Sequence, residues 1–170
     1  IDIKNVGYSV EGRLKISGLA TLVLPHDLIL DKLAGQVIGT TGNAIGTAVA
    51  DKAMRNRDGL TTSLNLIEAL VDPVKTRNII VENYRVMLQS NHDLVDKYPQ
   101  IIENFEKEGG IEHAADEFLA CLSEIKERGF GERNTYFMKE KLQQGAFVVG
   151  ETSQGVMLDS LKGPRPGVTS

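Results

Sequence analysis

The stretch LAGQVIGTTGNAIGTAVA, residues 33–50, is the most unusual part of the sequence, and the predicted fold depends on its conformation. It contains no charged residue, although 25% of the residues in the chain are charged. Its glycines, Gly35, Gly39, Gly42 and Gly46, are spaced four, three and four residues apart. This spacing would place all four on one face of a helix, and it predicts a helix with a continuous glycine seam.

A glycine seam requires a tightly packed neighbour, because glycine is unfavourable inside a helix. Each such glycine costs roughly 0.5–1 kcal/mol relative to alanine, so four of them cost about 2–4 kcal/mol. The close approach of another backbone along the seam would offset this cost. The first interpretation of residues 33–50 is therefore a helix buried inside the domain or at an interface with a protein partner.

A second interpretation places the glycine-rich helix 33–50 in a membrane. Eighteen uncharged residues are barely long enough to span a bilayer. Only five of them are Leu, Ile or Val, and they must also carry Gln36, Asn43 and three threonines. Insertion of this helix would be marginal, so contact with a membrane is possible but not favoured.

A third interpretation is a loop that cradles a phosphate group. In this case Gly39, Thr40, Thr41, Gly42 and Gly46 would surround the anion, since backbone N–H groups at the start of a helix bind phosphates. The spacing of these glycines matches neither G-x-G-x-x-G nor the Walker pattern. The loop 39–46 is therefore an alternative site for a nucleotide or another phosphate ligand.

The sequence outside this stretch predicts strands at the two ends and helices between them. Alternating apolar residues on both sides of Glu11-Gly12 predict an N-terminal hairpin, and 146–149 with 156–158 predict a C-terminal one. Residues 111–128 form the clearest helical pattern, and Asp72-Pro73 is typical of a helix start. We expect an α+β fold, in which about five to seven helices are flanked by terminal β-hairpins that form a small antiparallel sheet.

Length and charge limit the class of protein. A chain of 170 residues is expected to form one domain, which we place at residues 1–161, before an irregular Pro/Gly tail at 162–170. The net charge of −4 argues against nucleic acid as a partner. The single cysteine, Cys121, excludes a disulfide within the chain and fits a reducing compartment. The expected location is the cytoplasm or a particle assembled inside the cell, although a removed targeting segment would leave no trace.

The titratable residues show no recognisable catalytic or metal-binding pattern. None of the three histidines lies in an H-E-x-x-H motif. His113 and Glu117 stand four residues apart, but a solvated helix face explains them more simply. Cys121 lies next to apolar residues and is interpreted as a half-buried core residue. We therefore expect no catalytic residue, no metal and no cofactor.

These observations favour a non-enzymatic structural or interaction protein. The expected function is that of a subunit in a larger assembly, such as a phage particle or a secretion system. Its partners would be other proteins or further copies of the chain, which meet the seam of Gly35, Gly39, Gly42 and Gly46. A membrane-active protein or delivered effector that uses helix 33–50, and a nucleotide-binding protein that uses loop 39–46, remain the alternatives.

Overall fold

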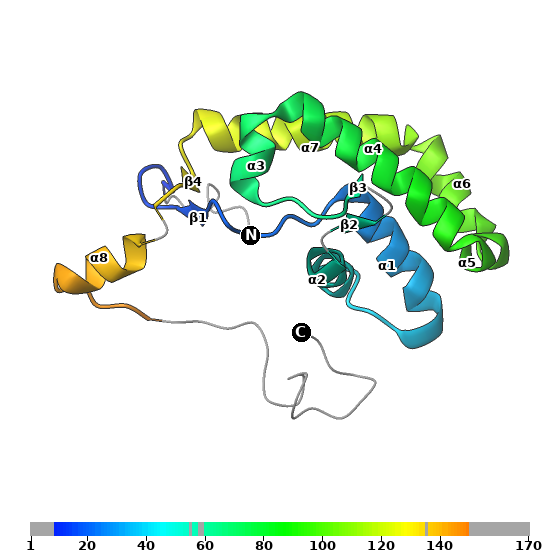
Figure 1. The fold of residues 1–170 in the computed structure, drawn as a ribbon, viewed down its shortest axis with the longest axis horizontal. Coiled ribbons are helices and arrows are strands. Elements are labelled where there is room, and N and C mark those ends of the chain that lie inside the picture. Colours follow the sequence, from blue (N-terminus) through cyan, green and yellow to red (C-terminus); the bar gives the residue numbers. More distant parts are fainter. Residues whose placement is uncertain (1–8, 55, 58–59, 135, 150–170) are drawn as a thin grey trace.

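The chain is dominated by helices in a computed structural model, which describes residues 9–54, 56–57, 60–134 and 136–149. Figure 1 shows the arrangement of its elements. In chain order they are β1 (Ile16–Ser17), α1 (Pro25–Ile38), α2 (Ile45–Met54), β2 (Asn56–Arg57), β3 (Leu60–Thr61), α3 (Leu66–Val71), α4 (Pro73–Ser90), α5 (His92–Lys97), α6 (Pro99–Lys107), α7 (Gly110–Glu127), β4 (Gly131–Glu132) and α8 (Phe137–Gln143).

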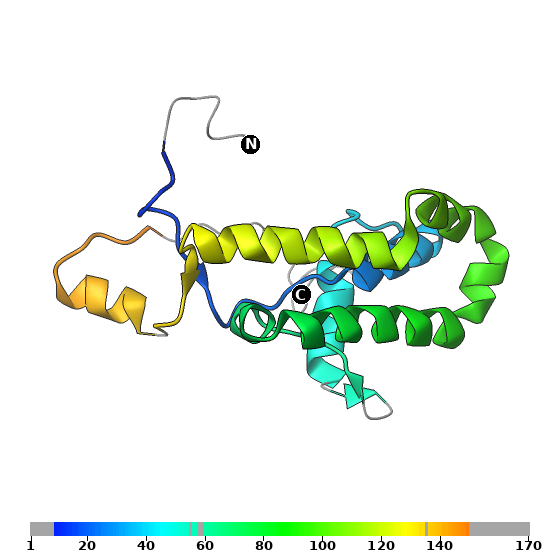
Figure 2. The ribbon, with the colours of Figure 1, turned by 90° about the horizontal axis from the view of Figure 1, so that it is seen from above.

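The two longest helices, α4 and α7, form the centre of the fold. Figure 2 shows them running side by side, with α5 and α6 connecting them at one end. Helix α4 begins where Asp72 accepts a hydrogen bond from the backbone N–H of Lys75, at 2.9 Å, and Pro73 fills the first turn. Helix α7 ends before Gly129, whose φ of +62° turns the chain away. Local sequence signals therefore determine where α4 begins and where α7 ends.

Helix α1 packs against this pair and carries much of the core. It contacts α4, α7, α6 and α5 on one side and α2 on the other. Large core side chains are almost completely buried on α1, on α3 and on α4. They are Leu24 and Leu33 at the start and in the middle of α1, Leu66 of α3, and Ile80 and Met87 of α4. Figure 1 shows α1 and α2 together on one side of the layer that α4 and α7 form.

The predicted antiparallel sheet of terminal hairpins is wrong. Strand β1 pairs in parallel with β4, with Ile16 opposite Gly131 and Ser17 opposite Glu132. Residues 11–13 form a turn in which Val10 accepts hydrogen bonds from the backbone N–H groups of Arg13 and Leu14. The partner of β1 is β4, which follows α7, and residues 6–8 of the expected N-terminal hairpin lie outside the described residues.

The C-terminal hairpin is not formed by the residues that the structure describes. Residues 146–149 are not in a strand, and the side chain of Phe147 is 93% exposed. The expected partner strand 156–158 and the expected tail 162–170 lie outside the described residues. The one antiparallel strand pair in the described ranges joins β2 to β3, in the middle of the chain.

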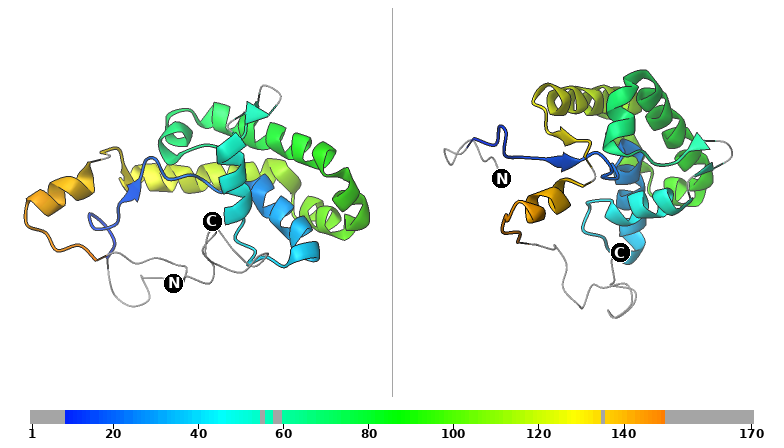
Figure 3. Two further views of the ribbon diagram at one scale, coloured as in Figure 1. Left: turned by 60° about the horizontal axis from the view of Figure 1, so that its bottom comes forward. Right: turned by 60° about the vertical axis from the view of Figure 1, so that its left-hand side comes forward.

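Helix α8 lies apart from the helical body. Figure 3 shows it projecting from the end of the fold where β1 and β4 meet. Its side chains Met138 and Leu142 are more than half exposed. In the part of the chain that the structure describes, no helix is long and apolar enough to cross a membrane.

The central role of α4 can be tested with one truncation. Ile80 is fully buried, and its replacement in Ile80→Ala should lower the free energy of unfolding by about 2–5 kcal/mol, because the cavity cannot fully close. The matched change Val74→Ala, at a side chain that is 73% exposed on the same helix, should alter it by less than about 0.5 kcal/mol. Urea denaturation followed by circular dichroism measures both values, and equal effects of the two changes would contradict the assigned core.

Candidate functional site

The glycine-rich segment is not one helix. Helix α1 ends at Ile38, a loop follows, and α2 begins at Ile45. Within the loop Gly39 and Gly42 have φ values of +68° and +76°, and Ala44 has a φ of +54°. A left-handed backbone interrupts a right-handed helix, and glycine adopts it most readily. The prediction of a continuous helix over residues 33–50 is therefore wrong.

The four glycines of the predicted seam consequently do not share one helical face. Gly35 lies in α1, Gly39 and Gly42 lie in the loop, and Gly46 lies in the first turn of α2. A Cβ atom on Gly35 would stand 3.0 Å from the hydroxyl oxygen of Thr40, whereas one on Gly46 would meet no atom within 4 Å. Gly35 thus permits a close contact with the chain's own loop, and Gly46 borders open space.

The loop is held in place by the carboxylate of Asp31, which comes from the middle of α1. One of its oxygens, Oδ2, accepts a hydrogen bond from the hydroxyl of Thr40 at 3.0 Å and another from the backbone N–H of Ala44 at 3.3 Å. The Thr40 hydroxyl in turn accepts a hydrogen bond from the backbone N–H of Gly42 at 3.3 Å. Asp31 is only 7% exposed, so these bonds to a charged group are shielded from water.

The outer face of the loop is open to solvent. Residues 39–43 are exposed, whereas Ala44 is buried. Thr41 and Asn43 lie on this exposed stretch, and a 3.5 Å hydrogen bond joins their side chains. The first N–H groups of α2 have no acceptor within their own helix, and the helix dipole makes this end partly positive. Of the predicted phosphate loop, Gly39, Thr40, Thr41 and Gly42 lie in this exposed turn, and Gly46 follows in the first turn of α2.

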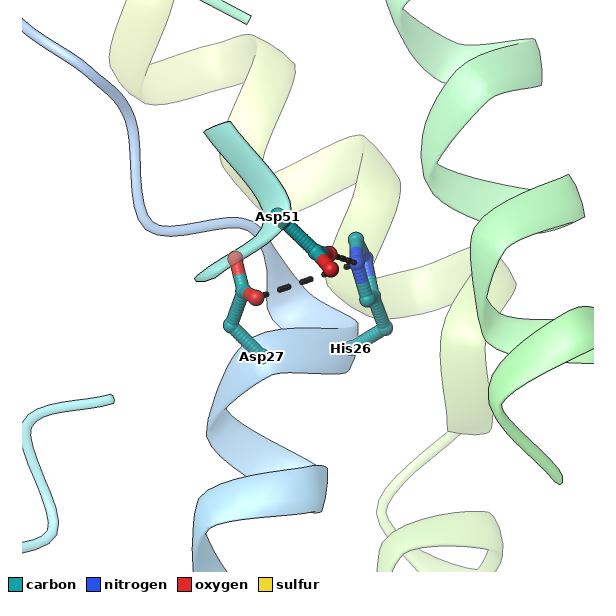
Figure 4. A group of neighbouring side chains, drawn as sticks. All are labelled: His26, Asp27 and Asp51. Carbon is teal, nitrogen blue, oxygen red and sulfur yellow. Dashed lines mark hydrogen bonds and ion pairs between the residues drawn. The ribbon is translucent and has the colours of Figure 1, made fainter. Parts of the chain in front are cut away.

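A second group of polar side chains lies where the first turn of α1 packs against α2. His26 and Asp27 from α1 and Asp51 from α2 are all buried, and Figure 4 shows their side chains turned toward one another. The Nε2 atom of His26 lies 3.2 Å from Oδ2 of Asp51 and 3.8 Å from Oδ1 of Asp27. Burial raises the pKa of the Asp27 carboxyl above its ordinary value, and the Asp51 carboxylate adds to this, although His26 and the Leu24 amide oppose it.

This buried cluster has no counterpart among the predicted site residues. His26 and Asp51 are 25 residues apart, so no short motif connects them. The Pro25 start of α1 was the only local signal, and it identifies a helix rather than a site. The packing of α1 against α2 creates the cluster, so the spacing of these residues in the sequence could not predict it.

The titratable residues that the sequence singled out on α7 form a charged surface. His113 and Glu117 are exposed, with 3.6 Å between Nε2 and Oε1, as expected of a solvated helix face. Glu112 and Asp116 of the same helix form ion pairs with Arg77 at 2.6 and 3.0 Å. The expectation of a half-buried Cys121 is wrong, because this cysteine is exposed.

Comparison with known proteins identifies the family. The family model named adenylosuccinate synthetase matches residues 2–170. The chain belongs to the adenylosuccinate synthetase family. Adenylosuccinate synthetase 2 of Cupriavidus pinatubonensis is 31% identical over 170 residues, which are 96% of this chain and 32% of that protein. The adenylosuccinate synthetase of Chlorobium chlorochromatii is 31% identical over 178 residues, covering 99% of this chain and 36% of that protein.

The same relationship holds for a third adenylosuccinate synthetase, from Actinobacillus pleuropneumoniae serotype 5b. It is 33% identical over 170 residues, which are 96% of this chain and 35% of that protein. The chain therefore spans about a third of the length of the curated relatives that it matches. The prediction of a non-enzymatic assembly subunit is wrong, because these relatives are named as synthetases. The nucleotide-binding alternative agrees better with the family.

The hold of Asp31 on the loop can be tested by hydrogen exchange. In Asp31→Ala the backbone N–H of Ala44 loses its charged acceptor, which is worth about 1.5–3 kcal/mol. Exchange of the Ala44 amide should become roughly ten- to a hundredfold faster. Asp93→Ala, which removes a carboxylate that is 93% exposed, should leave this rate unchanged. An unaltered rate in Asp31→Ala would show that other contacts hold the loop.

Proposed function

We propose that this chain is part of an adenylosuccinate synthetase and that loop 39–46 holds the phosphate group of the nucleotide. Membership of the family supports the proposal at the level of the reaction. The open, glycine-rich turn before α2 supports it at the level of the site. Adenylosuccinate is a succinyl derivative of adenosine monophosphate, so an enzyme that makes it handles a nucleotide phosphate.

The loop offers this phosphate uncharged donors. The first N–H groups of α2 point along the helix axis toward the exposed turn, and their combined dipole attracts negative charge. The Thr41 hydroxyl lies on the exposed side of the loop and provides a further donor. Gly46 leaves open space beside this turn, so the anion can approach the backbone closely.

Thr40 has a different role from Thr41 in this proposal. Its hydroxyl donates to Asp31 and accepts from the N–H of Gly42, so its hydrogen-bonding capacity is largely used inside the loop. Thr40 therefore positions the turn, and Thr41 contacts the phosphate. The buried Asp31 carboxylate contributes to the site by holding the loop through the Thr40 hydroxyl and the Ala44 N–H.

The loop contains no Lys or Arg, so the charge of the phosphate must also be balanced from elsewhere. We propose that another part of the enzyme or a second copy of the chain supplies these cations, in keeping with the expected protein partners. The apolar side chains on both sides of the loop are suited to such a contact. Val37 and Ile38 are 62% and 66% exposed, and Ile45 is 44% exposed.

Substitution of Gly46 separates binding from folding. The methyl group in Gly46→Ala would meet no protein atom within 4 Å and should raise helix stability by about 0.5–1 kcal/mol. It would fill the space assigned to the phosphate, so the affinity for adenylosuccinate should fall by at least roughly tenfold, equivalent to about 1.4 kcal/mol. Isothermal titration calorimetry measures this change, and thermal melting checks the fold.

Ala50→Ser is the matched control, because it adds one atom a turn further along the same exposed helix face. It should bind adenylosuccinate as the wild-type chain does. If Gly46→Ala bound adenylosuccinate as tightly as the wild-type chain, the phosphate would not bind at this loop. Failure of the wild-type chain to bind adenylosuccinate at all would count against the proposed function itself.

A further inference from the structure

The buried cluster of His26, Asp27 and Asp51 is not explained by the phosphate loop. One nitrogen and two carboxylate oxygens from these side chains lie within 4.8 Å of one another. The three residues are 2%, 1% and 6% exposed. A buried carboxyl group is unfavourable unless hydrogen bonds, a proton or a cation compensate it, and Asp51 already has a hydrogen-bond partner in His26.

The strongest indication of a missing occupant is an oxygen of Asp27. Its Oδ2 atom accepts a hydrogen bond from the backbone N–H of Leu24 at 2.8 Å, and so helps to begin α1. Its Oδ1 atom is buried, accepts no hydrogen bond and faces His26 Nε2 at 3.8 Å, which is too long for a hydrogen bond. Buried acceptors without a partner are rare in folded proteins, so this atom points to a ligand.

His26 is hydrogen-bonded on one side of its ring, where Nε2 lies 3.2 Å from Oδ2 of Asp51. Its Nδ1 atom is buried without a hydrogen-bond partner, so no contact through that atom determines which ring nitrogen carries the proton. A metal ion that replaces the proton between Nε2 and Asp51 would leave the ring proton on Nδ1 and direct the lone pair of Nε2 into the space that it shares with the two carboxyl groups (Figure 4). A neutral imidazole with two carboxylates is a ligand set that first-row divalent metals accept.

We propose that His26, Asp27 and Asp51 bind a divalent transition-metal ion, with Zn²⁺ as the best match. Zinc ligands in proteins lie about 2.0–2.2 Å from the ion, which places two ligands of a tetrahedron about 3.4 Å apart. The observed separations of 3.2 and 3.8 Å from His26 Nε2 bracket this value. All three donor atoms lie within 4.8 Å of one another, so they can occupy three corners of the tetrahedron after the side chains adjust.

The proposed metal is structural rather than catalytic. Its ligands come from the first turn of α1 and from α2, the two helices that border loop 39–46. A bound ion would hold these helices together below the loop, in addition to Asp31. The free energy of metal binding would then add to the stability of the fold.

The experiment uses the 170-residue chain without a histidine tag, purified from cells grown with added Co²⁺ or Zn²⁺. Elemental analysis should find about one ion per chain, and the cobalt form should show the intense visible bands of four-coordinate Co²⁺. Asp27→Asn should lower the retained metal by at least about tenfold, since an amide oxygen is a weaker ligand. His113→Ala, which removes an exposed histidine beside Glu117, should keep the full complement of metal.

Thermal melting provides a readout that does not depend on the variants. The metal-loaded wild-type chain should melt at a higher temperature than the same chain after treatment with a chelator. The proposal would be overturned if the wild-type protein contained no metal and its melting temperature did not respond to Zn²⁺ or Co²⁺. A proton on Asp27 would then be the compensating charge. Equal metal content in Asp27→Asn and the wild type would also overturn it. None of these outcomes depends on nucleotide binding.

Discussion

The two hydrogen bonds that the Asp31 carboxylate accepts, from the Thr40 hydroxyl and the Ala44 N–H, determine how α1 connects to α2. Because the carboxylate is buried in the middle of α1, it draws the loop back onto the helix that precedes it. The left-handed turns at Gly39, Gly42 and Ala44 follow from this contact, since the chain must reverse within six residues. The position at which α2 starts, and hence the direction of its first N–H groups, depends on the same contact.

The helices could largely be predicted from the sequence because their signals are local. Asp72 and Pro73 mark the start of α4, and Gly129 marks the end of α7, as the sequence indicates. The strands could not be predicted, since β1 finds its partner at Gly131–Glu132, after all the intervening helices. Alternation of apolar residues shows that a segment can form a strand, but it does not show which segment will pair with it.

Only part of the candidate site could be predicted from the sequence. The spacing of Gly35, Gly39, Gly42 and Gly46 fits a helical seam, and it misled because two of these glycines serve a turn instead. The phosphate interpretation treated residues 39–46 as a loop, and the structure has a loop at 39–44, but the interpretation did not include the contact from Asp31 that shapes this loop. The cluster of His26, Asp27 and Asp51 arises from the packing of α1 against α2, so it becomes apparent only in three dimensions.

In the proposed function, the turn before α2 contacts the phosphate of a nucleotide. The most direct measurement is a titration of the ¹⁵N-labelled chain with adenylosuccinate, followed by amide chemical shifts. The account predicts that the largest shifts occur at Thr41 to Thr47, and that inorganic phosphate moves the same amides in the same direction. Saturable binding whose largest shifts lie away from this loop, with Thr41 to Thr47 unmoved, would contradict the account.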